Sequence, residues 1–419
     1  MRVMLVSPKY NHPRGFEEYP SGALVSLGTI ARRMGHEVRC LHLELGDDLL
    51  RELFAFAPDI VGVTATTVQV KSAREVVQQA EWWSRWANHK ALVLAGGAHV
   101  SALGREFLLT CPKLDAICIG EGETTWMQVL KGNPLAEVVN LVTRNGGSNG
   151  YMAPDLDGIS FLPDLSLFDL GRFTGAMPPG PQPSMFVMGS RGCPFECIFC
   201  QNAWGRKVRY RSPESIIAEI RHLRSQGIKE IFFQDDNFNL NHTWAKDVLS
   251  GIISGGLNDI AYRLVFRANE KLVTSELLHL ARRAGVWIIF YGIESLSQRM
   301  LDGMRKGLAV GEIERAVRLT QEAGIKVQAS FVIGLPGETR ETIRETAEGL
   351  KRLKPDVYGC VPALPLPGTE LMRTARETGH LVSDNYDDYM LGQVVCGTDE
   401  LSTDDIRQAL RVFQGATWN

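Results

Sequence analysis

Three cysteines stand in the run Cys193-Pro-Phe-Glu-Cys197-Ile-Phe-Cys200, a CxxxCxxC spacing that is suited to metal binding. An iron–sulfur cubane takes four thiolates and a structural zinc site takes four nitrogen or sulfur ligands, but no fourth cysteine follows nearby. Three thiolates could hold three irons of a [4Fe–4S] cluster and leave the fourth iron open to a small ligand. The spacing therefore favours a catalytic cluster, with half of a zinc site as the alternative.

Charged side chains follow the strands that we expect after this loop. Asp235 and Asp236 come directly after the apolar run 231–233, where their carboxylates could accept hydrogen bonds from an ammonium group. Acidic residues also cap helix N-termini, so a structural role is equally open for them. Arg267 ends the next strand and could offer its guanidinium to a carboxylate. Glu294 ends the strand after that and could accept hydrogen bonds from ribose hydroxyls.

A repeated helix–glycine–strand pattern would position these residues. Ser212-Pro213-Glu214 is typical of a helix start, and Gly227 is typical of its end. An apolar strand follows, and the same order recurs twice. The expected strands begin near Met185 and lie at 231–233, before Arg267, and at 287–290, 327–333 and 357–361; the fifth carries Gln328 and Ser330. Six such strands predict a partial (β/α)6 barrel of the TIM type, with its ligand site at the carboxyl ends of the strands.

The first 130 residues show a second alternation of strands and helices. Apolar runs that indicate strands occur at 3–7, 38–43, 60–64, 92–95 and 116–119. The alternation predicts a doubly wound, Rossmann-like sheet of five parallel strands, which binds ligands beyond the carboxyl ends of its strands. The residues expected there are Thr64 and Thr66 after the third strand, Gly96, Gly97 and Ser101 after the fourth, and Gly120 and Glu121 after the fifth.

The stretch 131–184 has the weakest pattern. Asn145-Gly-Gly is a hairpin turn signal, and Pro178-Pro-Gly-Pro-Gln-Pro183 excludes a regular helix. We therefore interpret the chain as a first domain, a linker with a small hairpin, a barrel and a short C-terminal segment that contains a helix near 404–413. Their bounds are 1–130, 131–184, 185–372 and 373–419.

The composition excludes several classes of protein. The chain has 419 residues, of which 22% are charged, and a net charge of −3, so no basic excess suggests a nucleic-acid surface. No apolar run approaches the roughly 18 residues of a membrane span. The apolar run in the first residues is too short for the core of a signal peptide. Eight cysteines in so long a chain do not indicate a disulfide framework. We expect a cytoplasmic protein, in a compartment that suits an oxygen-sensitive cluster.

The cysteine loop, the apolar run 185–188 before it and the strand-end residues after it resemble the radical S-adenosylmethionine (SAM) superfamily. The resemblance implies that Cys193, Cys197 and Cys200 ligate a [4Fe–4S] cluster whose open iron binds the amine and carboxylate of SAM. Further roles are implied for the other residues: Asp235 or Asp236 for the amine, Arg267 for the carboxylate, Glu294 for the ribose, Phe199 for the adenine, and Gln328 and Ser330 elsewhere in the SAM site. The implied reaction is reductive cleavage of SAM to a 5′-deoxyadenosyl radical.

The first domain resembles the cobalamin-binding domains that precede some radical SAM domains. The segments that carry this likeness are Pro58-Asp-Ile-Val-Gly-Val-Thr64, Ala95-Gly-Gly-Ala-His99 and Asp115-Ala-Ile-Cys-Ile-Gly-Glu-Gly-Glu123. The residues expected at its strand ends, from Thr64 to Glu121, would then bind cobalamin. His12-Pro-Arg-Gly15 supplies half of the Asp-x-His-x-x-Gly cobalt motif, but Tyr10 replaces the Asp. We therefore expect His12 to be a loop residue and the cobalt to lack a protein imidazole.

The two resemblances together imply a cobalamin-dependent radical SAM enzyme, most of whose characterised relatives are methyltransferases. Methyl transfer to an unactivated carbon through methylcobalamin is the leading interpretation. Radical rearrangement or cyclisation, and transfer of the 3-amino-3-carboxypropyl group of SAM to a soft acceptor, are the enzymatic alternatives. A non-catalytic cobalamin carrier or sensor is the remaining one. The implied partners are an electron donor such as flavodoxin or ferredoxin and an unidentified small-molecule or peptide substrate, with no nucleic acid.

Overall fold

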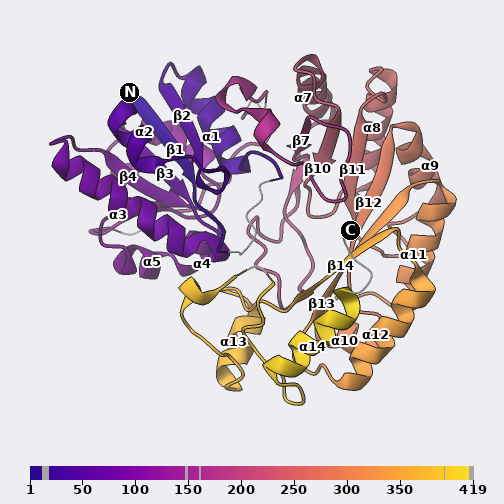
Figure 1. Cartoon of the computed structure of the whole chain (residues 1–419). Coiled ribbons are helices and arrows are strands. Elements are labelled where there is room, and N and C mark those ends of the chain that lie inside the picture. The colour runs from indigo at the N-terminus through magenta and orange to yellow at the C-terminus, as the bar shows by residue number, and fades with distance from the viewer. Residues whose placement is uncertain (12–17, 147–149, 160–161, 391, 415–419) are drawn as a thin grey trace. The chain divides into compact units, whose positions relative to one another are not determined.

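The computed structural model describes residues 1–11, 18–146, 150–159, 162–390 and 392–414, and it divides them into two units. Unit 1 comprises residues 1–174 and a short segment that begins at Asn385. Unit 2 comprises Gly175–Asp384 and the chain from Gly392 onward. The division after Thr174 lies inside the segment 131–184, and each unit is built around its own sheet (Figure 1).

Unit 1 contains, among its described residues, a six-stranded sheet in the order β2-β1-β3-β4-β5-β6. Its strands are β1 (Arg2–Ser7), β2 (Glu37–His42), β3 (Ile60–Thr64), β4 (Leu92–Gly96), β5 (Ala116–Cys118) and β6 (Leu141–Thr143). The first five are parallel, which confirms the doubly wound sheet. The sixth pairs antiparallel with β5, an edge strand that the sequence pattern did not reveal. Its three residues are too few to show an alternation.

The helices of unit 1 connect these strands. They are α1 (Gly22–Arg33), α2 (Leu49–Phe56), α3 (Val70–Trp86), α4 (Ala98–Leu103), α5 (Arg105–Thr110) and α6 (Glu123–Leu130), with the 3₁₀ turn η2 (Thr67–Gln69) before α3. Helix α1 packs against α6, and α2 packs against α3. Right-handed crossovers place α1 on one face of the sheet and α2 and α3 on the other. The loops that follow β1, β3, β4 and β5 therefore meet at one edge.

Unit 2 contains, in the part of the chain that is described, a six-stranded sheet in the order β14-β13-β12-β11-β10-β7, and its pairs are all parallel. Its strands are β7 (Ser184–Val187), β10 (Glu230–Phe233), β11 (Ala261–Phe266), β12 (Val286–Glu294), β13 (Lys326–Ile333) and β14 (Val357–Pro362). The strands are thus in chain order, as in a partial barrel, which confirms the expected fold. A two-stranded ribbon of β8 (Ser190–Arg191) and β9 (Arg209–Tyr210) follows β7.

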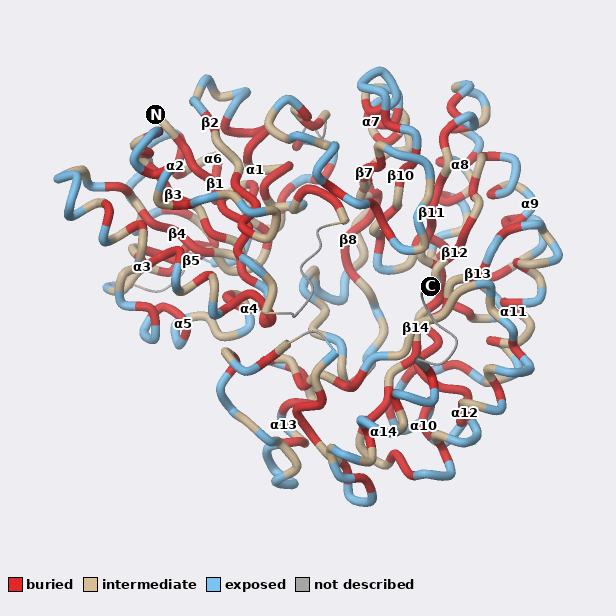
Figure 2. Tube along the Cα trace, in the orientation of Figure 1, coloured by how far each residue is buried: buried red, intermediate tan, exposed pale blue. Residues whose placement is uncertain are grey.

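The helices described in unit 2 are α7 (Pro213–Ser225), α8 (His242–Ser254), α9 (Ser275–Arg283), α10 (Gln298–Gly303), α11 (Val310–Glu322), α12 (Arg340–Leu353), α13 (Glu370–Glu377) and α14 (Thr403–Gln414). Of these, α7, α8, α9, α11 and α12 run along the outer side of the sheet (Figure 1). Buried positions concentrate on the strands and on the helix faces toward them (Figure 2). Helix α14, close to the helix expected at 404–413, buries Ile406 and Leu410 against Ile333 of β13. The C-terminal segment therefore completes the core beside β13 and β14.

Within the described ranges, every helix falls short of the length and apolar content that a membrane crossing requires.

Candidate functional site

The cysteine loop lies between β8 and β9, just beyond the carboxyl end of β7. Hydrogen bonds join the start of the loop to its later part: Cys193 N donates to Gly205 O (3.1 Å), and Asn202 Nδ2 donates to Cys193 O (3.0 Å). Gly192 has a φ of 108°, and a Cβ there would lie 2.5 Å from the carbonyl oxygen of Lys207. The loop therefore requires a glycine at this position.

All three cysteines of the loop are free thiols. Asn237 Nδ2 lies 3.4 Å from the Cys193 sulfur. Burial raises the pKa of Cys193 and Cys200, and the charge of the neighbouring Cys197 raises both further. Among the described residues, no three His, Cys, Asp or Glu side chains converge on a single metal ion. The thiolates of a cubane bind separate irons, so three thiols spaced along one loop fit a cluster better than a mononuclear ion.

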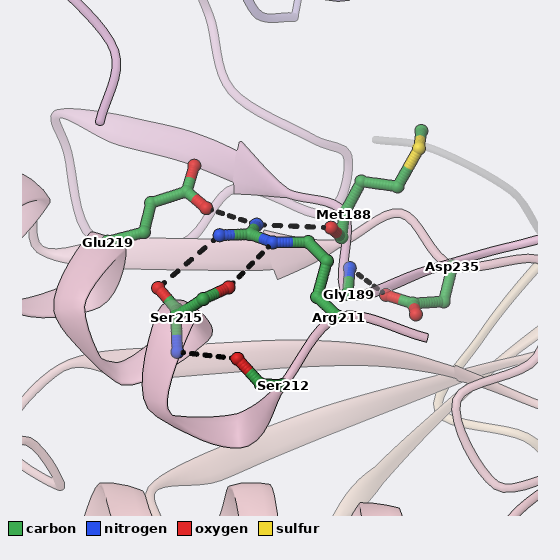
Figure 3. Close-up of polar contacts among 7 residues, drawn as sticks. All are labelled: Met188, Gly189, Arg211, Ser212, Ser215, Glu219 and Asp235. Atoms are coloured by element: carbon green, nitrogen blue, oxygen red, sulfur yellow. Dashed lines mark hydrogen bonds and ion pairs between the residues drawn. The ribbon is translucent and has the colours of Figure 1, made fainter. Parts of the chain in front are cut away.

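A buried network supports the chain before the loop (Figure 3). Asp235, after β10, accepts hydrogen bonds from Gly189 N (3.1 Å) and from the Ser190 hydroxyl. Arg211, after β9, donates to Met188 O (3.3 Å) and pairs with Glu219 of α7, and both side chains of this pair are almost fully buried. These contacts fix the chain between β7 and β8 from two sides, so they position Cys193 without touching it.

The two successive carboxylates expected to bind the SAM amine have different environments. Asp235 is 2% exposed, and burial raises its pKa to about 6 while its hydrogen bonds oppose the shift. Asp236 is exposed and accepts one hydrogen bond, from Gly192 N (3.1 Å). The structure therefore uses Asp235 to hold the chain and leaves Asp236 able to meet a ligand.

Arg267, directly after β11, faces the cysteine loop. Its guanidinium carbon lies 3.4 Å from the centre of the Phe195 ring, and it donates to the Lys306 carbonyl. Burial lowers the pKa of Arg267, and the charge and hydrogen bond of Cys197 oppose that shift. Its Nε is buried and has no partner among the described residues. The structure thus gives Arg267 a direct part in holding Cys197, in addition to the carboxylate role that we expected.

Glu294 ends β12 with a φ of 68°, in the left-handed region that non-glycine residues rarely adopt. Its Oε1 forms an ion pair with Lys306 Nζ (2.9 Å), and the two side chains are only 10% and 9% exposed. The Ser330 hydroxyl donates to its other oxygen (3.4 Å). A strained backbone held by a buried ion pair is typical of a functional site.

Lys306 is a residue that sequence reasoning missed. It lies in the turn between α10 and α11, where no spacing marks it. The structure places its Nζ 6.0 Å from the centre of the Phe199 ring and its carbonyl against Arg267. Lys306 therefore connects Glu294, Arg267 and Phe199, three residues expected at the SAM site. It adds a buried ammonium group to a site that would receive a carboxylate.

Gln328 is the residue that the structure places elsewhere. It lies two positions before Ser330 on β13, and its amide donates to the Met177 carbonyl (3.1 Å). Arg263 also donates to the backbone here, at Pro178, and pairs with Glu230 at the start of β10. Gln328 thus belongs to a polar layer near the amino ends of the strands, where its amide binds Met177 and not the other SAM-site candidates.

The second set of expected residues lies at the carboxyl edge of the unit 1 sheet. Thr66, exposed, hydrogen-bonds Gln69 (2.9 Å) and caps η2, while Thr64, Gly96 and Gly97 are partly exposed at the ends of β3 and β4. Gly97 has a φ of 110°, and a Cβ there would lie 2.6 Å from Ala65 O. These loops approach closely and leave bare backbone at the edge, which fits a bulky planar ligand.

The remaining residues of this set position the loop after β5. Ser101 Oγ accepts from Gly120 N (2.9 Å), and Glu121, which is 1% exposed, accepts from the Tyr151 hydroxyl (3.0 Å). The Tyr151 ring covers the Cα of Gly120. Glu121 and Tyr151 therefore support the loop after β5 and cover Gly120. His12 lies outside the described residues.

Family models match both units. The model of the Radical SAM superfamily matches residues 187–350, and the model of the B12 binding domain matches residues 11–130. The first range contains the three cysteines and the residues around Lys306. The second contains the residues from Thr64 to Glu121 that were expected to bind cobalamin.

Similar proteins are found along nearly the whole chain. The uncharacterized methyltransferase PH0819 of Pyrococcus horikoshii is 32% identical over 98% of this chain and 91% of its own length. The anaerobic magnesium-protoporphyrin IX monomethyl ester cyclase of Cereibacter sphaeroides is 29% identical over 90% of this chain and 64% of its own. The radical SAM methyltransferase TsrM of Kitasatospora setae, solved with cobalamin and a [4Fe–4S] cluster, shares the fold with a TM-score of 0.71 at 22% identity, over 91% of this chain and 76% of that one.

Proposed function

This chain belongs to the radical SAM superfamily and carries a B12-binding domain ahead of its radical SAM domain, and from that premise we propose that it is a cobalamin-dependent methyltransferase. Its cofactors are a [4Fe–4S] cluster, SAM and cobalamin. The acceptor that we propose is an unactivated carbon, because a 5′-deoxyadenosyl radical, which abstracts a hydrogen atom, is needed where the C–H bond is not acidic enough for a base to remove its proton.

One observation carries the proposal: the relative of 32% identity that spans almost the full length of this chain is a methyltransferase by name. The match includes both units, so it does not rest on the widespread radical SAM domain alone. The similarity to a cyclase keeps cyclisation as the alternative to be tested, although that relative extends well beyond the part that this chain matches.

The residues of unit 2 supply binding and orientation in this proposal. The three thiolates would hold the cluster, and Asn237 and Arg267 would donate hydrogen bonds toward its sulfur ligands. Asp236 would accept from the SAM amine, and the Lys306–Glu294 pair would offer an ammonium to its carboxylate and a carboxylate to its ribose. The bound cofactors supply the electron, the radical and the methyl carrier. Positioning of this kind lowers the entropic part of the barrier.

A one-electron donor is required by every radical SAM enzyme, and we propose flavodoxin or ferredoxin in this role. Cys200 is the exposed member of the three cysteines, so the cluster edge beside it is where such a donor would approach. The oxygen sensitivity of the cluster favours a reducing, cytoplasmic setting.

The test is anaerobic reconstitution with iron, sulfide and hydroxocobalamin, incubation with SAM and a chemical one-electron reductant, and mass spectrometry of the products of SAM. Both 5′-deoxyadenosine and S-adenosylhomocysteine are expected. The deoxynucleoside without S-adenosylhomocysteine would indicate rearrangement or cyclisation, and methylthioadenosine would indicate transfer of the 3-amino-3-carboxypropyl group. Absence of all three would leave only a carrier or sensor and would contradict the proposal.

A further inference from the structure

Residues 385–390, which we call the strap, belong to unit 1 although the chain on both sides of them belongs to unit 2. The strap contains the 3₁₀ turn η6 (Tyr386–Asp388), which begins with Asn385 accepting a hydrogen bond from Asp387 N (3.1 Å). It lies more than 250 residues beyond the end of the B12-binding match at residue 130. The family match therefore assigns it no role.

The strap is bound to the loop after β1. Asn11 donates from Nδ2 to two strap carbonyls, those of Asp387 (2.8 Å) and Tyr389 (3.1 Å). The backbone N–H of Asn11 donates to Val68 O (2.7 Å), in the turn after β3. Asn11, through its side-chain and backbone amides, thus joins the strap to the loops that follow β1 and β3.

An ion pair joins the strap to α3. Arg74 Nη1 lies 2.6 Å from Asp387 Oδ1, and the two side chains are 25% and 33% exposed. Arg74 lies in the first turns of α3, the helix that begins directly after η2. The pair therefore holds the strap against the beginning of this helix, beside the loop that contains Thr64 and Thr66.

An aromatic contact joins the strap to the loop after β4. The rings of Tyr386 and His99 meet edge to face, with centroids 4.9 Å apart. His99 is fully buried and its Nδ1 lies 3.1 Å from Thr67 Oγ1, in η2. Its backbone N–H donates to Ala65 O (3.2 Å). Tyr386 thus covers the residue that ties the loops after β3 and β4 together.

The strap contacts the loops that follow three neighbouring strands, β1, β3 and β4, at the edge where doubly wound folds bind their ligands. We propose that the strap completes the cobalamin site: Tyr386 and Asp387 are positioning residues that hold these loops in the arrangement that binds cobalamin. The inference rests on the proposed function, since it concerns the same cofactor. Ordering the loops in advance lowers the entropic cost of binding, so removing the strap contacts weakens the affinity.

The test measures hydroxocobalamin affinity in the full chain by anaerobic titration, followed by visible absorbance. Tyr386→Leu removes the ring and keeps an apolar side chain, and Asp387→Asn removes the charge and keeps the carbonyl that Asn11 binds. We expect the dissociation constant to rise about tenfold for Tyr386→Leu and about threefold for Asp387→Asn, as loss of a buried ring contact and of a half-exposed ion pair implies. Tyr386→Phe, which retains the ring, is expected to bind as the wild type does.

Two controls separate a positioning role from general loss of structure. Asp384 is the residue before the strap and forms an ion pair with Arg376. Asp384→Asn makes the same chemical change there, and the affinity of this variant for hydroxocobalamin should be unchanged. Amide hydrogen exchange of the cobalamin-free protein should become faster at residues 9–11 and 67–69 in the two strap variants, while the melting temperature of unit 2 stays the same.

If both strap variants bound hydroxocobalamin with the affinity of the wild type and showed the same amide exchange, the inference would be overturned and the proposed function would stand. Failure of the wild type to bind hydroxocobalamin would overturn both. A fall in affinity that Tyr386→Phe shares with Tyr386→Leu would also contradict the ring contact on which the inference depends.

Discussion

Lys306 holds two of the residues expected at the SAM site, since its ammonium pairs with Glu294 and its carbonyl accepts from Arg267. The pair is almost fully buried, so each charge depends on the other for compensation. Glu294 also has a strained backbone that the surrounding contacts must hold. A change at Lys306 should therefore affect both stability and SAM affinity.

Replacing Lys306 by Met leaves the Glu294 carboxylate buried without its cation. Breaking a buried pair in this way costs about 3 kcal/mol, so we expect a fall of that order in the free energy of unfolding. The affinity for SAM should fall at least about tenfold, because the site loses its ammonium. Denaturant unfolding and anaerobic SAM titration measure the two effects.

The adjacent Arg305→Met provides the control, because its pair with Glu370 is half-exposed and worth less than about 1 kcal/mol. A double variant, K306M with E294M, should recover much of the stability but not the SAM affinity. Recovery of both would show that Lys306 acts on the fold alone.

Asp235 and Asp236 provide a second, matched pair of substitutions. Asp235→Ala removes the acceptor of Gly189 N and of the Ser190 hydroxyl, so it should lower the free energy of unfolding by about 2 kcal/mol and reduce cluster incorporation. Asp236→Ala should change stability by less than about 1 kcal/mol and weaken SAM binding about tenfold. Equal effects of the two variants on SAM affinity would contradict this division of roles.

These residues show what the sequence could and could not predict of the site. The three cysteines follow from spacing, and Arg267 and Glu294 follow from their place at strand ends. The choice between Asp235 and Asp236 does not, because it depends on which carboxylate turns toward Gly189. Lys306 lies in a turn between two helices, where only the folded chain brings it to Glu294.

At the scale of an element, the turn between β13 and α12 contains a buried acid. Glu338 is 2% exposed, accepts from Gly334 N (2.7 Å) and receives a weaker hydrogen bond from Thr342. Burial raises its pKa from 4.5 to about 7, and the hydrogen bonds oppose the shift. The folded protein therefore retains a proton there that the unfolded chain has lost above pH 5.

This proton makes stability depend on pH. Because the folded state binds more protons between pH 4.5 and 7, the free energy of unfolding should fall as the pH rises through that window, by up to about 3 kcal/mol from this group. Glu338→Gln should remove this part of the slope. Glu341→Gln, three residues further on and exposed, should leave the slope unchanged. Urea unfolding at a series of pH values measures it, and identical slopes in both variants would exclude Glu338 as the source.

Most elements could be predicted because their patterns are local. The helix α7 begins at the Ser212 cap and proline that the sequence shows, and β14 lies at the apolar run 357–361. Strand β6 and the strap are examples of elements that could not. Strand β6 is three residues at an antiparallel edge, and the strap is a polar and aromatic run whose burial depends on unit 1, far from it in sequence.

At the scale of the whole molecule, the two units hold different cofactors in the proposed function. The cluster ligands all belong to unit 2, and the residues expected to bind cobalamin all belong to unit 1, with the strap added from the C-terminal part of the chain. Loading of one cofactor should therefore be separable from loading of the other, since the ligands expected for each belong to separate units.

Cys197→Ala tests this separation. The variant loses one of three thiolates and the hydrogen bond of Arg267, so it should lose bound iron, sulfide and the visible absorbance of the cluster, and with them 5′-deoxyadenosine formation. Its hydroxocobalamin affinity should stay within about twofold of the wild type, as independent sites require. Cys396→Ala, a buried cysteine outside the loop, should retain both cofactors. If Cys197→Ala instead lost cobalamin together with its iron, the two sites would be coupled, and the strap, which joins a segment of the C-terminal region to unit 1, would be the first connection to examine.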